Sequence, residues 1–207
     1  MFKTIATVSA LILGANTQAL FSVGKKGWGK CSVQEDGMSN LDLNQYEGVW
    51  YEAWREEKTG QDEGKCAFTT YTQIDDYIKV ENRQVKQNWR GKWKLAGIDG
   101  EARCPDSGVG NCVVSFFWFM RKKPTDRFYN YQVMDTDYSN YAIVYTCTQA
   151  WFGLYHSEAA WIISRAAQPI SNDKDSWKTQ LGGYGYDVST MYETVQDNSC
   201  TYSMALK

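Results

Sequence analysis

The sequence is poor in the residues on which several classes of protein depend. Its 207 residues include one histidine and three prolines, and the formal net charge is only −2. No apolar run reaches the roughly 20 residues of a membrane-spanning helix, which excludes a multi-pass membrane protein. No block rich in lysine and arginine supplies the basic stripe typical of proteins that bind nucleic acid. The hydrophobic content of 43% is too high for a disordered chain, so a folded domain is expected.

Motifs for metal binding and for hydrolysis are also missing. The sequence has no CxxC motif, and His156 has no second histidine as a partner, so a metal site is not expected. No G-x-S-x-G motif accompanies this histidine, which argues against a serine hydrolase.

Residues 1–19 have the pattern of a secretory signal peptide. Lys3 supplies the charged start, an apolar stretch runs to Leu13, and Thr17 and Ala19 are the small residues that precede a cleavage site. A buried N-terminal helix is the alternative interpretation. The signal-peptide pattern predicts a secreted, extracellular protein that is cut after Ala19.

The sequence has six cysteines, which can form disulfides in the oxidising environment that secretion implies. An even number suggests three disulfides, and six cysteines allow 15 pairings. Cys104 and Cys112 flank a Pro-Asp-Ser-Gly-Val-Gly-Asn turn between two strand-like runs, which favours a bridge across the base of a hairpin. The other four cysteines lie far apart, and the residues alone leave their pairing open.

Aromatic residues are abundant, with 9 Trp, 14 Tyr and 8 Phe, and β-sheets accommodate such side chains well. Eight short segments, each bounded by turn residues, have the character of strands. This number favours an antiparallel barrel or a sandwich. The expected strands are Val49–Trp54, Phe68–Gln73, Tyr77–Glu81, Trp89–Ile98, Val113–Met120, Phe128–Met134, Tyr141–Cys147 and Ala159–Ser164.

The remaining segments complete a single domain. Residues 20–44 are polar and rich in glycine, and we expect an irregular N-terminal arm ahead of a domain at 45–207. The cluster at 171–173 suits the start of a helix over Lys174–Leu181, and Met191–Val195 is a last extended segment.

Three motifs in order resemble those of the lipocalin family. They are Gly48-Val49-Trp50-Tyr51-Glu52, then Thr136-Asp137-Tyr138 with the strand Tyr141–Cys147, and finally Trp161-Ile162-Ile163-Ser164-Arg165. The resemblance extends from about Cys31 to Cys200 and is closest to the group containing apolipoprotein D, crustacyanin and the insect bilin-binding proteins. It implies an all-β fold, an eight-stranded antiparallel up-and-down barrel with one C-terminal α-helix.

The resemblance also implies disulfides and structural residues. The pairings would be Cys31–Cys147 and Cys66–Cys200, which leaves Cys104–Cys112, the pair already suggested by its turn. Trp50 would plug the narrow end of the barrel with the Arg165 guanidinium across its indole. The residues assigned to the maintenance of the fold are Gly48, Trp50, Asp137, Tyr138 and Arg165.

Alternation along the strands predicts which side chains face into the barrel. Counting back from Arg165, which the resemblance places at the closed end, puts Ile163, Trp161 and Ala159 on one face, and the resemblance implies that this face points inward. The same reasoning places Ala142, Val144 and Thr146 inside on the preceding strand, and Trp50, Glu52 and Trp54 inside on the first. The resemblance adds Tyr71, Asn82 and Trp161 as lining positions. The candidate ligand-binding residues are therefore Trp161, Tyr71, Asn82, Val144, Ala142, Trp54, Glu52, Ile163 and His156.

His156 belongs to an aromatic segment expected at the open end. This segment could line the entrance, bind a partner or fold back on the rim. An inward Glu52 would need a proton or a polar partner in an apolar barrel.

The predicted function is transport of a small hydrophobic ligand by a secreted, non-catalytic protein. A carotenoid or bilin pigment, a retinoid, a sterol or a fatty acid would suit an aromatic barrel, and apart from such a chromophore no cofactor is expected. The sequence is compatible with a homo-oligomer. One alternative is an isomerase or redox enzyme acting on a similar ligand, which in the prostaglandin isomerase type needs an unpaired cysteine. The other is a secreted interaction protein whose barrel is filled by its own aromatic residues.

Overall fold

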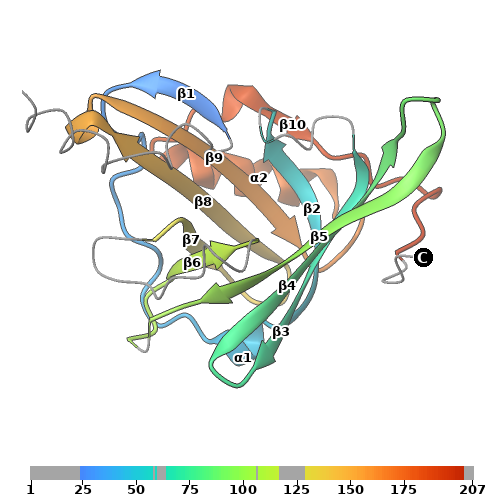
Figure 1. Cartoon of the computed structure of the whole chain (residues 1–207), viewed down its shortest axis with the longest axis horizontal. Coiled ribbons are helices and arrows are strands. Elements are labelled where there is room, and N and C mark those ends of the chain that lie inside the picture. Colours follow the sequence, from blue (N-terminus) through green and yellow to red (C-terminus); the bar gives the residue numbers. More distant parts are fainter. Residues whose placement is uncertain (1–23, 58, 60–63, 106, 117–128, 203–207) are drawn as a thin grey trace, which may run out of the picture.

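The computed structural model describes residues 24–57, 59, 64–105, 107–116 and 129–202. These residues form one antiparallel sheet in which each strand from β2 to β9 pairs with the next, and β9 pairs with β2 to close a barrel of eight strands. This is the up-and-down barrel that the sequence predicts (Figure 1). The barrel strands are β2 (Gly48–Glu56), β3 (Lys65–Ile74), β4 (Tyr77–Gln87), β5 (Trp93–Arg103), β6 (Asn111–Ser115), β7 (Tyr131–Thr136), β8 (Tyr141–Ala150) and β9 (Tyr155–Ser164).

Two further strands lie outside the closed barrel. β1 (Lys25–Trp28) pairs with β9, and β10 (Met191–Glu193) pairs with the C-terminal half of β2. The arm at 20–44 is therefore not wholly irregular where the structure describes it. Its strand is four residues long and is stabilised by a partner over 120 residues away, so local sequence gives little sign of it.

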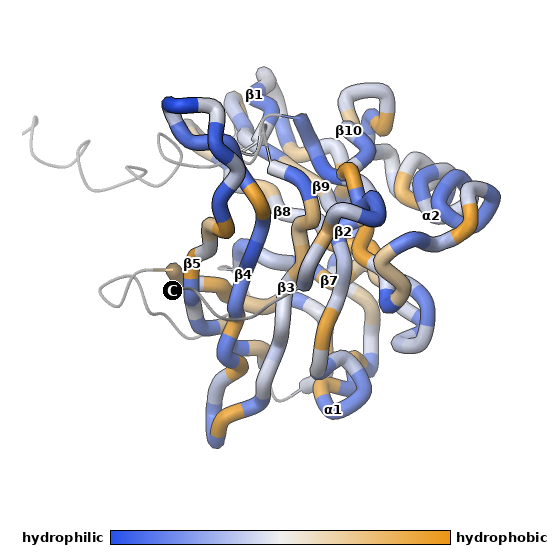
Figure 2. The backbone as a smooth tube through the Cα atoms, turned by 90° about the vertical axis from the view of Figure 1, so that its right-hand side faces the viewer, coloured by the Kyte–Doolittle hydropathy of each residue, from blue (hydrophilic) through white to orange (hydrophobic). Residues whose placement is uncertain are grey.

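Helices close one end of the barrel and cover one side. The short helix α1 (Leu43–Tyr46) is capped by the Asp42 side chain and lies at the end opposite the β4–β5 hairpin (Figure 1). The main helix α2 (Ser171–Gly183) lies against the outside of the barrel (Figure 2), and it buries Trp177 and Leu181 there. Two 3-10 turns, η2 (Trp151–Gly153) and η3 (Val188–Thr190), complete the secondary structure of the described residues.

Two apolar clusters result from this arrangement, because alternating side chains of the wall point to opposite faces. The inner cluster lies inside the barrel and includes Trp50, Tyr71 and Val144. The outer cluster lies between the wall and α2 and includes Ile162 and Leu181.

Several strand ends differ from the sequence prediction. Trp89 lies in the turn between β4 and β5, and β5 begins only at Trp93. β6 ends at Ser115, and residues 117–128 lie outside the described residues together with parts of two expected strands. The expected signal peptide at 1–19 also lies outside them.

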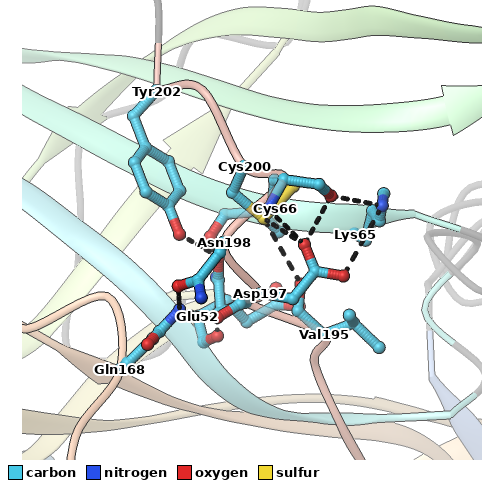
Figure 3. Close-up of a disulfide and its surroundings, with 12 residues drawn as sticks. Glu52, Lys65, Cys66, Gln168, Val195, Asp197, Asn198, Cys200 and Tyr202 are labelled. Carbon is cyan, nitrogen blue, oxygen red and sulfur yellow. Dashed lines mark hydrogen bonds and ion pairs between the residues drawn. A yellow bond between two sulfur atoms is a disulfide. The ribbon is translucent and has the colours of Figure 1, made fainter.

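All three disulfides have the predicted pairing, Cys31–Cys147, Cys66–Cys200 and Cys104–Cys112. The first ties the arm to β8, and the second ties the C-terminal segment to β3. Figure 3 shows the second disulfide, beside which the Lys65 ammonium lies 3.7 Å from the Asp197 carboxylate. The Gln196 amide donates to the carbonyls of Glu52 and Ala67 at 2.9 and 2.6 Å, so this segment also joins β2 to β3.

Candidate functional site

The closed end of the barrel is built around Trp50, which is fully buried. Its indole N–H donates to the Tyr46 carbonyl at 2.8 Å, and the Arg165 guanidinium lies 3.8 Å from the ring centre. Arg165 also donates to the carbonyls of Gln45, Val49 and Tyr138 at 2.7 to 3.0 Å. One guanidinium thus covers the plug, as the resemblance implies, and also ties α1, β2 and the β7–β8 turn together.

Gly48 and the β7–β8 turn shape the surroundings of that guanidinium. Gly48 has a φ of 103°, and a Cβ there would lie 3.2 Å from Nη1 of Arg165. The Asp137 carboxylate accepts from the amides of Ser139, Asn140 and Tyr141, and these hydrogen bonds lower its pKa against the opposing effect of burial. The turn therefore exists because one carboxylate satisfies three successive backbone donors.

Tyr138, in the same turn, links it to the N-terminal arm. Its backbone is left-handed, with a φ of 63°, and its hydroxyl accepts from the Asp42 amide at 3.0 Å. The same hydroxyl donates to the Asn40 carbonyl at 3.4 Å.

Above the plug, three tyrosines form a floor across the barrel. The Tyr131 hydroxyl lies 3.0 Å from that of Tyr46 and 2.8 Å from that of Tyr71. Burial raises the pKa of Tyr71 to about 12 and raises those of Tyr46 and Tyr131 well above their usual value. We call these three residues the tyrosine floor. A cavity of about 10 Å³ remains among the apolar groups around them, so the closed half of the barrel is filled.

The predicted inner positions on β8 and β9 do face inward. Ala142, Val144 and Ile163 are buried in the inner cluster, and half-buried Trp161 packs against it from a position opposite Val144. The parity prediction is therefore confirmed for these four residues.

Asn82 also lies on the inner face. Trp50, Thr69, Asn82 and Ile98 stand directly opposite one another across four strands, so they share one face. The Thr69 hydroxyl donates to Oδ1 of Asn82 at 2.7 Å. Ile98, at the end of this row, is 43% exposed although it faces inward.

Glu52 faces inward as predicted and has a charged partner. Its carboxylate lies 2.7 Å from Nη1 of Arg55, and both side chains are almost completely buried. Thr194 donates to the same carboxylate at 2.5 Å. The need for a polar partner is thus met from within the chain.

Trp54 does not face inward, and its predicted position is wrong. The pairing of β2 with β9 shifts between Glu52 and Trp54, so Ala53 is an extra residue that reverses the alternation. The Trp54 indole lies in the outer cluster, where the Lys178 ammonium of α2 is 3.9 Å from its ring centre. Arg55 takes the inner position opposite Trp161 instead.

His156 also lies on the outer face rather than at the entrance. It shares this face with Glu158, two residues further along β9, whose carboxylate accepts from the Ser32 hydroxyl of the arm at 2.7 Å. The imidazole Nδ1 is 3.0 Å from the Gly29 carbonyl, and a Cβ at Gly27 would lie 2.7 Å from the ring. Glycine at position 27 thus lets the arm cross directly over this histidine.

Sequence reasoning missed two residues of this inner wall, Arg55 and Tyr131, and also Thr194, whose hydroxyl bonds to Glu52. Arg55 is hidden by the bulge, and Thr194 reaches Glu52 only because β10 pairs with β2. Tyr131 carried a signal that could have found it, since alternation places it on the face of Val133.

The described part of the chain contains neither a candidate metal site nor a helix that could span a membrane. No group of three or more potential metal ligands occurs among these residues. No helix among them is long and apolar enough to cross a membrane.

The fold and the plugged end define the class of protein. Residues 41–196 match the family model described as a lipocalin-like domain, and the chain belongs to the lipocalin family. Apolipoprotein D of Macaca fascicularis is 34% identical over 180 residues, which cover 84% of this chain and 87% of that protein. The crustacyanin A1 subunit of Homarus gammarus is 36% identical over 70 residues, which cover 34% of this chain and 38% of that one.

Solved structures agree on the fold. Insecticyanin from the tobacco hornworm, Manduca sexta, superimposes with a TM-score of 0.68 at 23% identity, covering 87% of this chain and 94% of that one. Lobster apocrustacyanin A1 gives a TM-score of 0.63 at 21% identity, covering 84% and 93%.

Proposed function

We propose that this chain is a secreted, non-catalytic carrier that holds a small hydrophobic ligand in the half of its barrel beyond the tyrosine floor. The observation that carries the proposal is the contrast between the two halves. The closed half is filled, whereas the inward-facing Ile98 is 43% exposed and Trp161 is only half-buried. Large apolar groups on the inner wall that the chain does not cover suit an apolar ligand.

The proposed lining assigns different roles to the candidate residues. Trp161 would stack on a flat ligand, Asn82 would offer a polar contact, and Ile98 and Val144 would supply apolar wall. Tyr71 would contact the ligand as part of the tyrosine floor. Its hydroxyl is not free to bond to the ligand, because it is already hydrogen-bonded to Tyr131.

Ligand class follows from chemistry and from the relatives. Several relatives are named apolipoproteins, which supports a lipid-like ligand. A conjugated pigment such as a carotenoid or bilin, a retinoid or a sterol would also stack on Trp161. All six cysteines are in disulfides, so an isomerase that depends on a free thiol lacks its nucleophile in this chain.

Mass spectrometry of an organic extract of the native protein tests the proposal directly, and a coloured protein would already indicate a pigment. Titration with a retinoid, a bilin, a carotenoid and a fatty acid then compares the parent with Trp161→Ala. We expect quenched tryptophan emission in the parent and an affinity at least about tenfold weaker in the variant, equivalent to about 1.4 kcal/mol.

Trp54→Ala is the matched control, because the same truncation on the outer wall should leave affinity unchanged. If Trp161→Ala binds as well as the parent, the ligand does not occupy this barrel. If the native protein carries no organic molecule and binds none of the panel, the filled-barrel interaction protein replaces the carrier. The tyrosine floor is the feature that favours that second function.

A further inference from the structure

The β4–β5 hairpin extends beyond the strands that flank it. β3 pairs with β4 only as far as Val85, and within the described part of the chain β6 pairs with β5 only over Glu101–Arg103. The ladder between β4 and β5 nevertheless continues to Gln87 opposite Trp93. Residues 86–94, which we call the hairpin tip, project from the barrel at the end opposite α1, in green at the upper right of Figure 1.

Charge is concentrated in the hairpin tip. Four of its nine residues are basic and none is acidic, although the whole chain has a net charge of −2. The nearest acidic residues along the strands are Glu81 and Asp99. The basic residues are Lys86, Arg90, Lys92 and Lys94.

Three of these charges are open to solvent. Among the described residues, no carboxylate forms an ion pair with Arg90, Lys92 or Lys94, and all three are exposed. Lys94 stands directly opposite Lys86, so two basic residues lie side by side on neighbouring strands. The hairpin tip therefore presents three exposed positive charges that a negatively charged partner can reach.

Two exposed tryptophans accompany these charges. Trp89 is 86% exposed and Trp93 is 49% exposed. The Arg90 guanidinium lies 4.3 Å from the centre of the Trp89 ring. Tryptophan beside lysine and arginine is the combination enriched where proteins meet the boundary between lipid headgroups and acyl chains.

The turn presents these side chains from an ordered backbone. Oδ1 of Asn88 accepts from the amides of Arg90 and Lys92 at 2.9 and 3.0 Å. The Asn88 amide donates to the Lys92 carbonyl at 2.8 Å. Because the turn is already formed, binding needs little ordering of the backbone.

We propose that the hairpin tip docks this protein onto an anionic phospholipid surface. The basic side chains would meet the headgroups, while Trp89 and Trp93 enter the boundary region. A soluble polyanion would account for the charge but not for two indoles that stay 86% and 49% exposed beside their cations, so the lipid surface is favoured. The proposal does not depend on a ligand in the barrel, because none of the hairpin-tip residues belongs to the candidate lining.

Vesicle flotation tests it, with vesicles of phosphatidylcholine alone or with 30% phosphatidylserine at 0.05, 0.15 and 0.5 M NaCl. We expect binding to the anionic vesicles that weakens as salt rises. Arg90→Ser and Lys92→Ser should each lower partitioning onto the anionic vesicles about fivefold. Trp89→Ala with Trp93→Ala should lower it at least tenfold and abolish quenching of tryptophan emission by brominated lipid.

Matched controls remove the same kinds of group elsewhere. Lys79→Ser removes a half-exposed cation that is paired with Glu81, and Ile170→Ala removes an apolar side chain that is 66% exposed at the start of α2. Neither should change partitioning. Equal binding to both kinds of vesicle, or no loss in the hairpin-tip variants, overturns the proposal.

A heparin column separates the lipid surface from a polyanion. If the parent is retained through Arg90 and Lys92 but does not float with anionic vesicles, the partner is a polyanion and the proposal is wrong. Ligand titrations of the same hairpin-tip variants should match the parent, so failure of membrane docking and failure of the carrier function give different results.

Discussion

Trp50 shows how one side chain, through its contacts with α1 and Arg165, can hold the closed end of the barrel together. Its indole is fully buried, donates to the Tyr46 carbonyl and lies under Arg165. Trp50→Ala should therefore destabilise the protein by about 3–5 kcal/mol, since a cavity forms and the guanidinium loses its aromatic cover. Denaturant unfolding measures the loss. Trp89→Ala should change stability by less than about 0.5 kcal/mol, and equal losses in both variants would contradict the plug.

The Glu52–Arg55 pair illustrates a buried charge that has its own partner. The two groups are 2.7 Å apart and both are buried. Arg55→Met should cost about 3–5 kcal/mol, because the Glu52 carboxylate then stays buried without its counter-charge. The double variant with Glu52→Gln should recover much of this loss. A double-mutant cycle from unfolding free energies measures the coupling, and additive losses would show that the pair does not act as a unit.

At the scale of elements, the C-terminal segment closes a gap between two strands. β10 pairs with β2, the Gln196 amide bridges β2 and β3, and Cys66–Cys200 fixes the segment 134 residues from its partner. Replacing both cysteines by serine should cost up to about 5 kcal/mol, because a long loop in the unfolded chain is released.

The Cys104–Cys112 disulfide is the natural comparison, because it closes a loop of only eight residues. Its double serine variant should cost about half as much on the same chain-entropy argument. Thermal melts of the two variants make the comparison. A larger loss at the short loop would show that strain or native contacts, rather than loop length, decide the effect.

How far the sequence predicts these elements depends on whether the deciding contact is local. The motifs around Trp50 and Arg165 fix the parity of β8 and β9, and Trp161 is placed correctly from it. The same alternation fails at Trp54, because one extra residue at Ala53 leaves no mark in a run of β-favouring side chains. β1 was missed for a similar reason, since Lys25–Trp28 becomes a strand only through β9.

The whole molecule combines two cores that both bury tyrosine hydroxyls. The tyrosine floor lies in the inner core. In the outer core, Tyr145 donates to Glu158 at 2.7 Å and Tyr186 donates to Glu56 at 2.6 Å. Burial is the largest cause of the raised pKa in all five tyrosines, and in the outer pair the neighbouring carboxylates raise the pKa further. Each phenol must therefore stay protonated for the fold to keep its contacts.

This arrangement predicts a loss of stability at alkaline pH. In the unfolded chain these tyrosines ionise near pH 10, whereas in the folded chain the pKa of Tyr71 is about 12 and those of the other four are also raised. The unfolded state therefore releases protons first, and stability that is complete below pH 10 falls as pH rises. Between pH 9 and 11 the loss should be about 1 kcal/mol for each buried tyrosine, or several kcal/mol in total.

Urea unfolding at a series of pH values measures that slope. Tyr131→Phe removes one of the five groups, so its unfolding free energy should fall less steeply with pH than that of the parent, even though the variant is less stable at pH 7. Tyr192→Phe is the control for the loss of one hydroxyl from a ring that is 40% exposed. A parent whose stability stays constant from pH 9 to 11 would mean that water reaches these phenols in the folded protein, and that neither core is closed around them.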